Sequence, residues 1–186
     1  MHLVILVMGI GWAVFWIGWL LAAFTAKASR DQSSLCSALR LGLFVAAAYF
    51  LRLGWRGGGH GLAGGPVLDG LGLALWAAGL ALAIWARLYI GRNWGAPMSK
   101  RENPDLVTTG PYRLIRHPIY TGIIVAFIGT ALATSLFGLI AAVALAGFFI
   151  FSAVREEKFL AREFPEAYPD YKAKTKMLIP FAFNCS

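Results

Sequence analysis

Long stretches without a charged side chain constrain the fold of this protein more than any other feature. Residues 1 to 26 carry no formal charge at pH 7, and neither do residues 117 to 154. A helix crosses the ~30 Å apolar core of a bilayer with roughly 20 residues, so the first stretch suffices for one span and the second for two. Hydrophobic residues make up 59% of the 186-residue chain and charged residues 14%, a balance that soluble domains rarely reach. These features predict an all-α integral membrane protein.

The apolar segments predict about five transmembrane helices. The first covers residues 3 to 24, a shorter second span is centred on residues 41 to 51, and a third covers residues 67 to 90. The stretch from 117 to 154 predicts a helical hairpin with its turn at residues 133 to 138. Small residues suited to close helix packing recur in the first arm of this hairpin: Gly122, Ala126, Gly129 and Ala133. A signal peptide is the alternative interpretation of the first segment, which is, however, long and lacks a basic start.

The basic residues are distributed asymmetrically about these spans. With five spans, 15 of the 17 lysines and arginines fall on one side of the membrane, and Arg52 and Arg56 fall on the other. The positive-inside rule then predicts that the N-terminus lies outside and the C-terminus in the cytoplasm. Because the bases lie in short loops between apolar runs, the net charge of +8 indicates membrane topology rather than nucleic-acid binding.

A polar cluster before the fourth span is the first candidate for a functional site. Residues 110 to 122 read GPYRLIRHPIYTG, and Glu156 and Glu157 follow the fifth span. Ionisable groups at membrane depth are costly and commonly mark function. Pro118 suits the first position of a helix, whose free amides attract an anion, and Glu156 would supply the opposite charge. Such a pair suits a zwitterion, of which the methionyl part of S-adenosylmethionine is an example.

The pattern alone leaves a structural interpretation open. Arg116-His117-Pro118 could be a basic anchor at the membrane surface, and Glu156-Glu157 a solvated helix face. No metal is expected, because the three histidines and two cysteines are scattered. The chain also has no P-loop and no dinucleotide glycine fingerprint after a strand.

The C-terminal half resembles the isoprenylcysteine carboxyl methyltransferase family, and the related phospholipid methyltransferases share much of the pattern. The resemblance spans residues 93 to 181. It rests on four segments in order: LVTTGPY at 106 to 112, RHPIYTG at 116 to 122, Glu156-Glu157 with Leu160, Phe164, Tyr168 and Tyr171, and Ile179-Pro180. The resemblance implies a multi-span methyltransferase whose S-adenosylmethionine lies in a cytoplasmic pocket closed by the C-terminal segment. Residues 67 to 186 would form the cofactor-binding methyltransferase core of a single membrane domain, and residues 1 to 66 its N-terminal spans.

Carried over position by position, the resemblance implies roles for individual residues. The implied cofactor-binding residues are Asp105, Leu106, Val107, Tyr112, His117, Pro118, Ile119, Tyr120 and Glu156. The catalytic residues stay open, and the candidates are Arg116, Arg155 and Glu157. Where eukaryotic members have a substrate-contacting arginine four residues before the glutamate, this chain has Ser152, which weakens the case for a prenylcysteine carboxylate as the substrate.

The expected function is therefore methyl transfer from S-adenosylmethionine to a lipophilic acceptor, as in isoprenylcysteine carboxyl O-methylation. The alternatives are a phospholipid N-methyltransferase, an NADPH-dependent enzyme like the sterol reductases, and a non-enzymatic membrane scaffold. The expected partners are membrane lipid and a lipophilic, prenylated or lipid substrate, with no nucleic acid and no metal.

Overall fold

The protein is described by a computed structural model over residues 2–23, 29–31, 65–94, 100–101, 105–134 and 137–179. These residues form the following elements in chain order: α1 (His2–Ala23), β1 (Ser29–Asp31), α3 (Pro66–Ile90), η1 (Gly91–Asn93), β2 (Lys100–Arg101), η2 (Gly110–Arg113), α4 (Pro118–Thr134), α5 (Phe137–Glu163) and α6 (Ala167–Lys174). The two short strands pair antiparallel. The other regular elements of the described residues are helices, as the sequence predicts.

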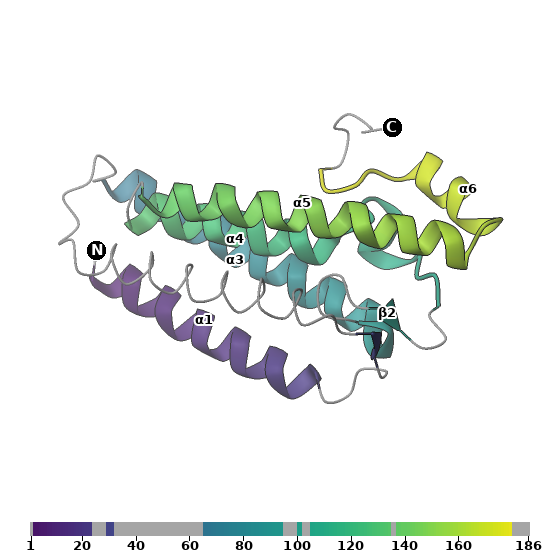
Figure 1. Ribbon diagram of the computed structural model, residues 1–186. Coiled ribbons are helices and arrows are strands. Elements are labelled where there is room, and N and C mark those ends of the chain that lie inside the picture. Colours follow the sequence, from purple (N-terminus) through teal and green to yellow (C-terminus); the bar gives the residue numbers. More distant parts are fainter. Residues whose placement is uncertain are drawn as a thin grey trace.

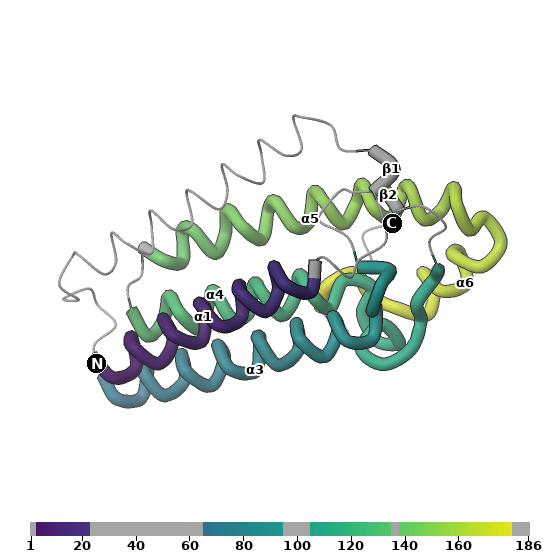
Figure 2. The backbone as a smooth tube through the Cα atoms, turned by 90° about the horizontal axis from the view of Figure 1, so that it is seen from below, coloured from purple at the N-terminus to yellow at the C-terminus, as the bar shows by residue number. Residues whose placement is uncertain are grey.

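The long helices α3, α4 and α5 run lengthwise side by side, and α1 lies alongside them (Figure 1). The start of α1 and the end of α5 with α6 lie at opposite ends of this bundle (Figure 2). Helix α4 runs antiparallel to α3 and α5, so its first residues lie at the same end as the last residues of both. The polar segment before α4 is therefore brought to the end of the bundle where α5 carries its two glutamates.

Among the described residues, three helices are long and apolar enough to cross a membrane: Leu3–Ala22, Pro66–Asn93 and Gly138–Glu163. The shorter apolar helix Pro118–Thr134 pairs with the last of them, and the chain reverses between Thr134 and Phe137, where the sequence predicts the hairpin turn. The predicted second span at residues 41 to 51 lies outside the described residues. The apolar helices confirm the class of helical membrane protein.

Helices α3 and α4 pack through glycines at very short range. A Cβ added at Gly79 would lie 2.5 Å from the amide nitrogen of Ala126, and one added at Gly122 would lie 2.5 Å from the carbonyl oxygen of Gly79. No side chain fits at such distances, so the two backbones are in direct contact. In a bilayer, where helices gain little from hiding apolar surface, this close approach supplies the van der Waals contact that holds them together.

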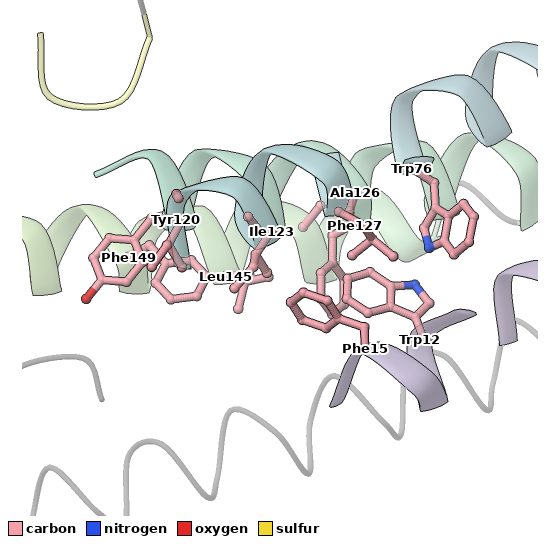
Figure 3. Packing of buried hydrophobic residues seen from close by; sticks show 14 of the residues in the cluster. Trp12, Phe15, Trp76, Tyr120, Ile123, Ala126, Phe127, Leu145 and Phe149 are labelled. Carbon is pink, nitrogen blue, oxygen red and sulfur yellow. The ribbon is translucent and has the colours of Figure 1, made fainter. Parts of the chain in front are cut away.

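Helix α1 is attached to the bundle by aromatic rings. Trp12 and Phe15 project from α1 towards Phe127 of α4 (Figure 3), and the ring centroids of Trp12 and Phe127 are 4.8 Å apart. The indole Nε1 of Trp12 also donates a buried hydrogen bond of 3.0 Å to Oγ1 of Thr130. Since the indole would otherwise be an unsatisfied donor in apolar surroundings, this bond fixes the position of α1 along α4.

Replacing Trp12 with phenylalanine should lower the free energy of unfolding by about 1 kcal/mol, because it removes this bond and part of the ring contact. Thermal unfolding in detergent measures the change. A double-mutant cycle with Thr130→Val should show that the two losses are not additive, since both variants break the same bond. Trp85→Phe is the control, because the Trp85 side chain is exposed on α3. Equal destabilisation by Trp12→Phe and Trp85→Phe would contradict the assigned role of the bond.

Candidate functional site

The chain enters the site through a turn that requires glycine. Gly110 begins η2 with φ at +59°, in the left-handed region, and a Cβ at this position would lie 2.5 Å from Cε1 of Tyr89. The turn directs the chain past the end of α3 and into α4, which begins at the buried Pro118. The proline fixes the first helical residue, so the residue before it, His117, is held at the mouth of the helix.

His117 lies between the two glutamates at the end of α5. Its Nδ1 is 3.6 Å from Oε2 of Glu156, and its Nε2 is 3.6 Å from Oε1 of Glu157. The hydroxyl of Tyr120, one turn further along α4, donates a hydrogen bond of 2.5 Å to Oε1 of Glu156. The start of α4 and the end of α5 therefore meet in a compact acid–imidazole–phenol cluster.

Stacked rings support this cluster from the apolar side. The rings of His117 and Tyr120 are parallel within 2° at a centroid distance of 5.4 Å, and the ring of Tyr120 stacks on Phe149 of α5 at 4.5 Å. Tyr120 and Phe149 also belong to the hydrophobic core that continues along the bundle (Figure 3). The core thus fixes the orientation of the polar groups at its end.

The two adjacent glutamates differ in access to solvent. The side chain of Glu156 is 23% exposed, whereas that of Glu157 is 7% exposed. Glu157 accepts a hydrogen bond of 2.6 Å from Nε of Arg116 and lies 3.4 Å from Nζ of Lys172. Glu156 is therefore the more accessible of the two carboxylates, and Glu157 is the one held by basic side chains of the protein.

The C-terminal segment passes beside the chain that leads into α4. The amides of Arg116 and His117 donate hydrogen bonds of 2.8 and 3.0 Å to the carbonyls of Lys176 and Met177, and the amide of Lys176 donates one of 3.2 Å to Leu114. The hydroxyl of Thr121 adds a bond of 2.6 Å to the carbonyl of residue 178. This parallel bridge places residues 175 to 178 directly over the start of α4.

Buried tyrosines and an arginine complete the surroundings. The hydroxyl of Tyr171 donates a bond of 2.8 Å to the carbonyl of Tyr112. Burial raises the pKa of Tyr112, and Tyr171 and Glu156 raise it further, whereas Arg87 lowers it. Burial also raises the pKa of Tyr171. Both phenols therefore stay protonated at neutral pH, so they offer hydrogen-bond donors and no negative charge.

Arg87 joins α1 to this end of the molecule. It is buried at the end of α3, and its Nη2 donates a bond of 2.7 Å to the carbonyl of Ala22, while its Nη1 donates one of 2.6 Å to Gly91. Its guanidinium also lies 4.8 Å from the ring centroid of Trp94. Two spans and the loop after α3 are held together by this one cation.

The remaining predicted site residues lie around the cluster or away from it. Asp105 is exposed and accepts a bond of 3.1 Å from Nδ2 of Asn93, while Leu106 and Val107 are half-buried. Ile119 is buried in the core. Of the three catalytic candidates, Arg155 is exposed and lies over the ring of Phe151, so the described contacts do not bring it to the cluster.

Several partners in this site were not predicted from the sequence, namely Lys172, Thr175 and Thr121. Arg116 was the signal in the sequence that could have indicated them, because a guanidinium has five donors and one carboxylate cannot satisfy them all. The sequence could not say which carbonyls would accept these hydrogen bonds, because they lie in a segment more than 50 residues away, at Lys172 and Thr175.

Ser152 is fully buried, and its hydroxyl donates a bond of 2.8 Å to the carbonyl of Phe148 in its own helix. Within the described residues, no three His, Cys, Asp or Glu side chains are grouped so that they could hold a metal ion.

The model of one protein family matches the part of the chain that contains this cluster. It is the model of the phospholipid methyltransferases, and it matches residues 69–167, from α3 to the start of α6. The chain belongs to the phospholipid methyltransferase family. This membership and the structural similarity reported below confirm the resemblance found in the sequence.

Curated relatives extend the comparison. The chain is 35% identical over 128 residues to the cobalt-zinc-cadmium resistance protein CzcN of Cupriavidus metallidurans, a match that covers 66% of this chain and 55% of the relative. It is 41% identical over 78 residues to methanethiol S-methyltransferase 1 of Bradyrhizobium diazoefficiens, covering 42% of this chain and 27% of the relative. The chain thus spans only part of the length of these relatives.

A solved structure shares the fold of this family member. The eukaryotic intramembrane Ras methyltransferase ICMT, an isoprenylcysteine carboxyl methyltransferase, matches with a TM-score of 0.52 and 25% sequence identity. The match covers 82% of this chain and 55% of that chain. The similarity extends beyond the residues of the family model and confirms a helical membrane fold like that of ICMT.

Proposed function

We propose that this protein is an S-adenosylmethionine-dependent methyltransferase of the membrane that acts on a lipophilic acceptor. The observation that carries the proposal is the partly exposed Glu156, held by Tyr120 and His117 where α4 begins and α5 ends. The family membership supports methyl transfer, and so do the names of the two similar methyltransferases, one acting on a thiol and one on isoprenylcysteine.

The residues of the cluster fit such a cofactor. S-adenosylmethionine carries an ammonium and a sulfonium, and both are stabilised by a carboxylate and by the faces of aromatic rings. Glu156 supplies the carboxylate and keeps part of its surface accessible, while His117 and Tyr120 hold it in place. The neutral phenol of Tyr112 adds no negative charge that would repel the cofactor carboxylate.

We retain as proposed cofactor-binding residues those that the sequence indicates. They are Asp105, Leu106, Val107, Tyr112, His117, Pro118, Ile119, Tyr120 and Glu156. Bound S-adenosylmethionine would supply a methyl group that is already activated for transfer. The protein must then bind and orient the two reactants and keep water away, and it needs no strong acid. The buried side chains of Pro118 and Ile119 suit this exclusion of water.

We propose further that the acceptor arrives from the bilayer on the cytoplasmic side. The cluster lies at the end of apolar helices whose outer faces carry many exposed hydrophobic side chains, so a lipid-soluble molecule can approach along them. The cytoplasmic assignment rests on the distribution of lysine and arginine, which puts this end of the helices on the basic side.

Calorimetric titration of the detergent-purified protein with S-adenosylhomocysteine and, separately, with NADPH tests the function. We expect saturable binding of S-adenosylhomocysteine and no heat from NADPH, because the site offers a carboxylate for an ammonium rather than cations for a phosphate. Binding of NADPH alone would support a reductase. Binding of neither compound would support a scaffold without enzymatic activity.

A further inference from the structure

Arg116 is buried and joins three parts of the chain. Its side chain is 4% exposed, and its Nε donates to Glu157 of α5 at 2.6 Å. Its Nη1 donates to the carbonyl of Thr175, just after α6, at 2.6 Å and to that of Lys172 in α6 at 3.2 Å. A charge removed from water in this way is tolerated because it is paired and hydrogen-bonded on several sides.

Glu157 has a matching set of contacts. One oxygen accepts from Arg116 and lies near Nε2 of His117, and the other lies 3.4 Å from Nζ of Lys172. Both members of the pair thus contact protein groups around them, whereas the adjacent Glu156 is the more exposed carboxylate. The geometry of Arg116 and Glu157 suits support of the site better than contact with reacting atoms.

The pair holds the segment that covers the start of α4. Residues 175 to 178, which we call the C-terminal strap, bond through their backbone to Leu114, Arg116 and His117. The guanidinium of Arg116 holds the first carbonyl of the strap, and the carbonyl of Met177 holds the amide of His117 at 3.0 Å. The position of the imidazole between the two glutamates therefore depends on the strap being docked.

We infer that Arg116 and Glu157 are positioning residues that fasten the C-terminal strap across the start of α4 and thereby hold His117 against Glu156. The inference rests on the proposed function for its link to cofactor affinity, whereas docking of the strap is a property of the protein without ligand. It assigns Arg116 and Glu157 a role distinct from that of Glu156, although Glu157 is its neighbour in the chain.

Hydrogen exchange combined with ligand binding tests the inference on Arg116→Gln. The amides of His117 and Lys176 report docking directly, because each donates a hydrogen bond between the strap and the segment that leads into α4. In Arg116→Gln both amides should exchange at least tenfold faster, and the dissociation constant for S-adenosylhomocysteine should rise at least tenfold. Glu156→Gln should weaken binding while both amides stay protected. Lys174→Ala, an exposed change on α6, should alter neither quantity.

Two further variants guard against simple misfolding. Arg116→Lys keeps the charge beside Glu157 but cannot reach both carbonyls, so it should give intermediate exchange and intermediate affinity. The double variant Glu157→Gln with Arg116→Gln should show no faster amide exchange and no weaker binding than Arg116→Gln alone, since the two residues act as one unit.

Different results separate this inference from the proposed function. Loss of affinity in Arg116→Gln with both amides still protected would overturn the inference, since Arg116 would then contact the ligand. Faster exchange with unchanged affinity would overturn the link between strap and site. If the unmodified protein binds no S-adenosylhomocysteine, the proposed function fails, and protected amides in Arg116→Gln would still overturn the role of Arg116 in docking.

Discussion

Replacement of Glu156 by glutamine should raise the dissociation constant for S-adenosylhomocysteine by roughly 10- to 100-fold. The change keeps the size of the side chain and removes the negative charge that faces the proposed ammonium. Hydrogen bonds to a charged group contribute about 1.5 to 3 kcal/mol, which corresponds to this range of affinity. Tyr120 would still donate to the remaining amide oxygen, so the fold should be preserved. Calorimetric titration measures the loss.

Glu163→Gln is the matched control for this prediction. Glu163 lies on the same helix two turns further on and is exposed, so its replacement removes the same charge without touching the cluster. It should bind with the affinity of the unmodified protein. His117→Ala should weaken binding as Glu156→Ala does, because it removes the ring that Glu156 and Tyr120 contact. Unchanged affinity in both alanine variants would show that His117 and Glu156 do not form the binding site.

Replacement of Gly122 by leucine should destabilise the fold by about 3 kcal/mol or prevent folding. Overpacking a well-filled interior commonly costs about 1 to 3 kcal/mol, and here the new side chain would meet backbone atoms that cannot rotate away. A Cβ at this position already lies 2.5 Å from the carbonyl oxygen of Gly79 and 3.0 Å from the Cβ of Ala83. Thermal unfolding and the yield of monodisperse protein in detergent measure the effect.

Gly70→Leu on α3 and Gly147→Leu on α5 provide the controls. A Cβ at either position meets no atom within 4 Å, so both helices should tolerate the larger side chain. The comparison separates a steric clash from the general effect of placing leucine at a glycine in a helix. Comparable stability of Gly122→Leu and Gly70→Leu would show that the backbones of α3 and α4 are not in close contact.

Local patterns in the sequence were sufficient for the class of fold. Uncharged stretches of sufficient length form helices in a membrane because the backbone has to satisfy its own hydrogen bonds there. This reasoning predicted the first and third spans and the pair of helices that follows them, α4 and α5. The small residues Gly122 and Gly129 predicted close packing, but nothing local shows that the partner is α3 rather than α5 or another protein.

The sequence predicted some residues of the site and left the roles of others open. The family motifs indicated His117, Tyr120 and Glu156, and the structure brings these three into contact. The same motifs left Arg116, Arg155 and Glu157 as equivalent catalytic candidates. The structure separates them, because Arg116 and Glu157 are bonded to each other in the interior and Arg155 is exposed over Phe151.

By itself, the sequence determined that this protein is a helical membrane protein, approximately where its first and third spans lie, and which family its motifs indicate. These properties follow from the composition and spacing of residues close together in the chain. Only the tertiary structure decided which of two adjacent glutamates is partly exposed beside His117 and Tyr120, and which is buried against Arg116. Successive residues on a helix point about 100° apart, so their roles depend on neighbours from distant segments. Here those neighbours are Tyr120 for Glu156 and Arg116 for Glu157, which lie 36 and 41 residues away.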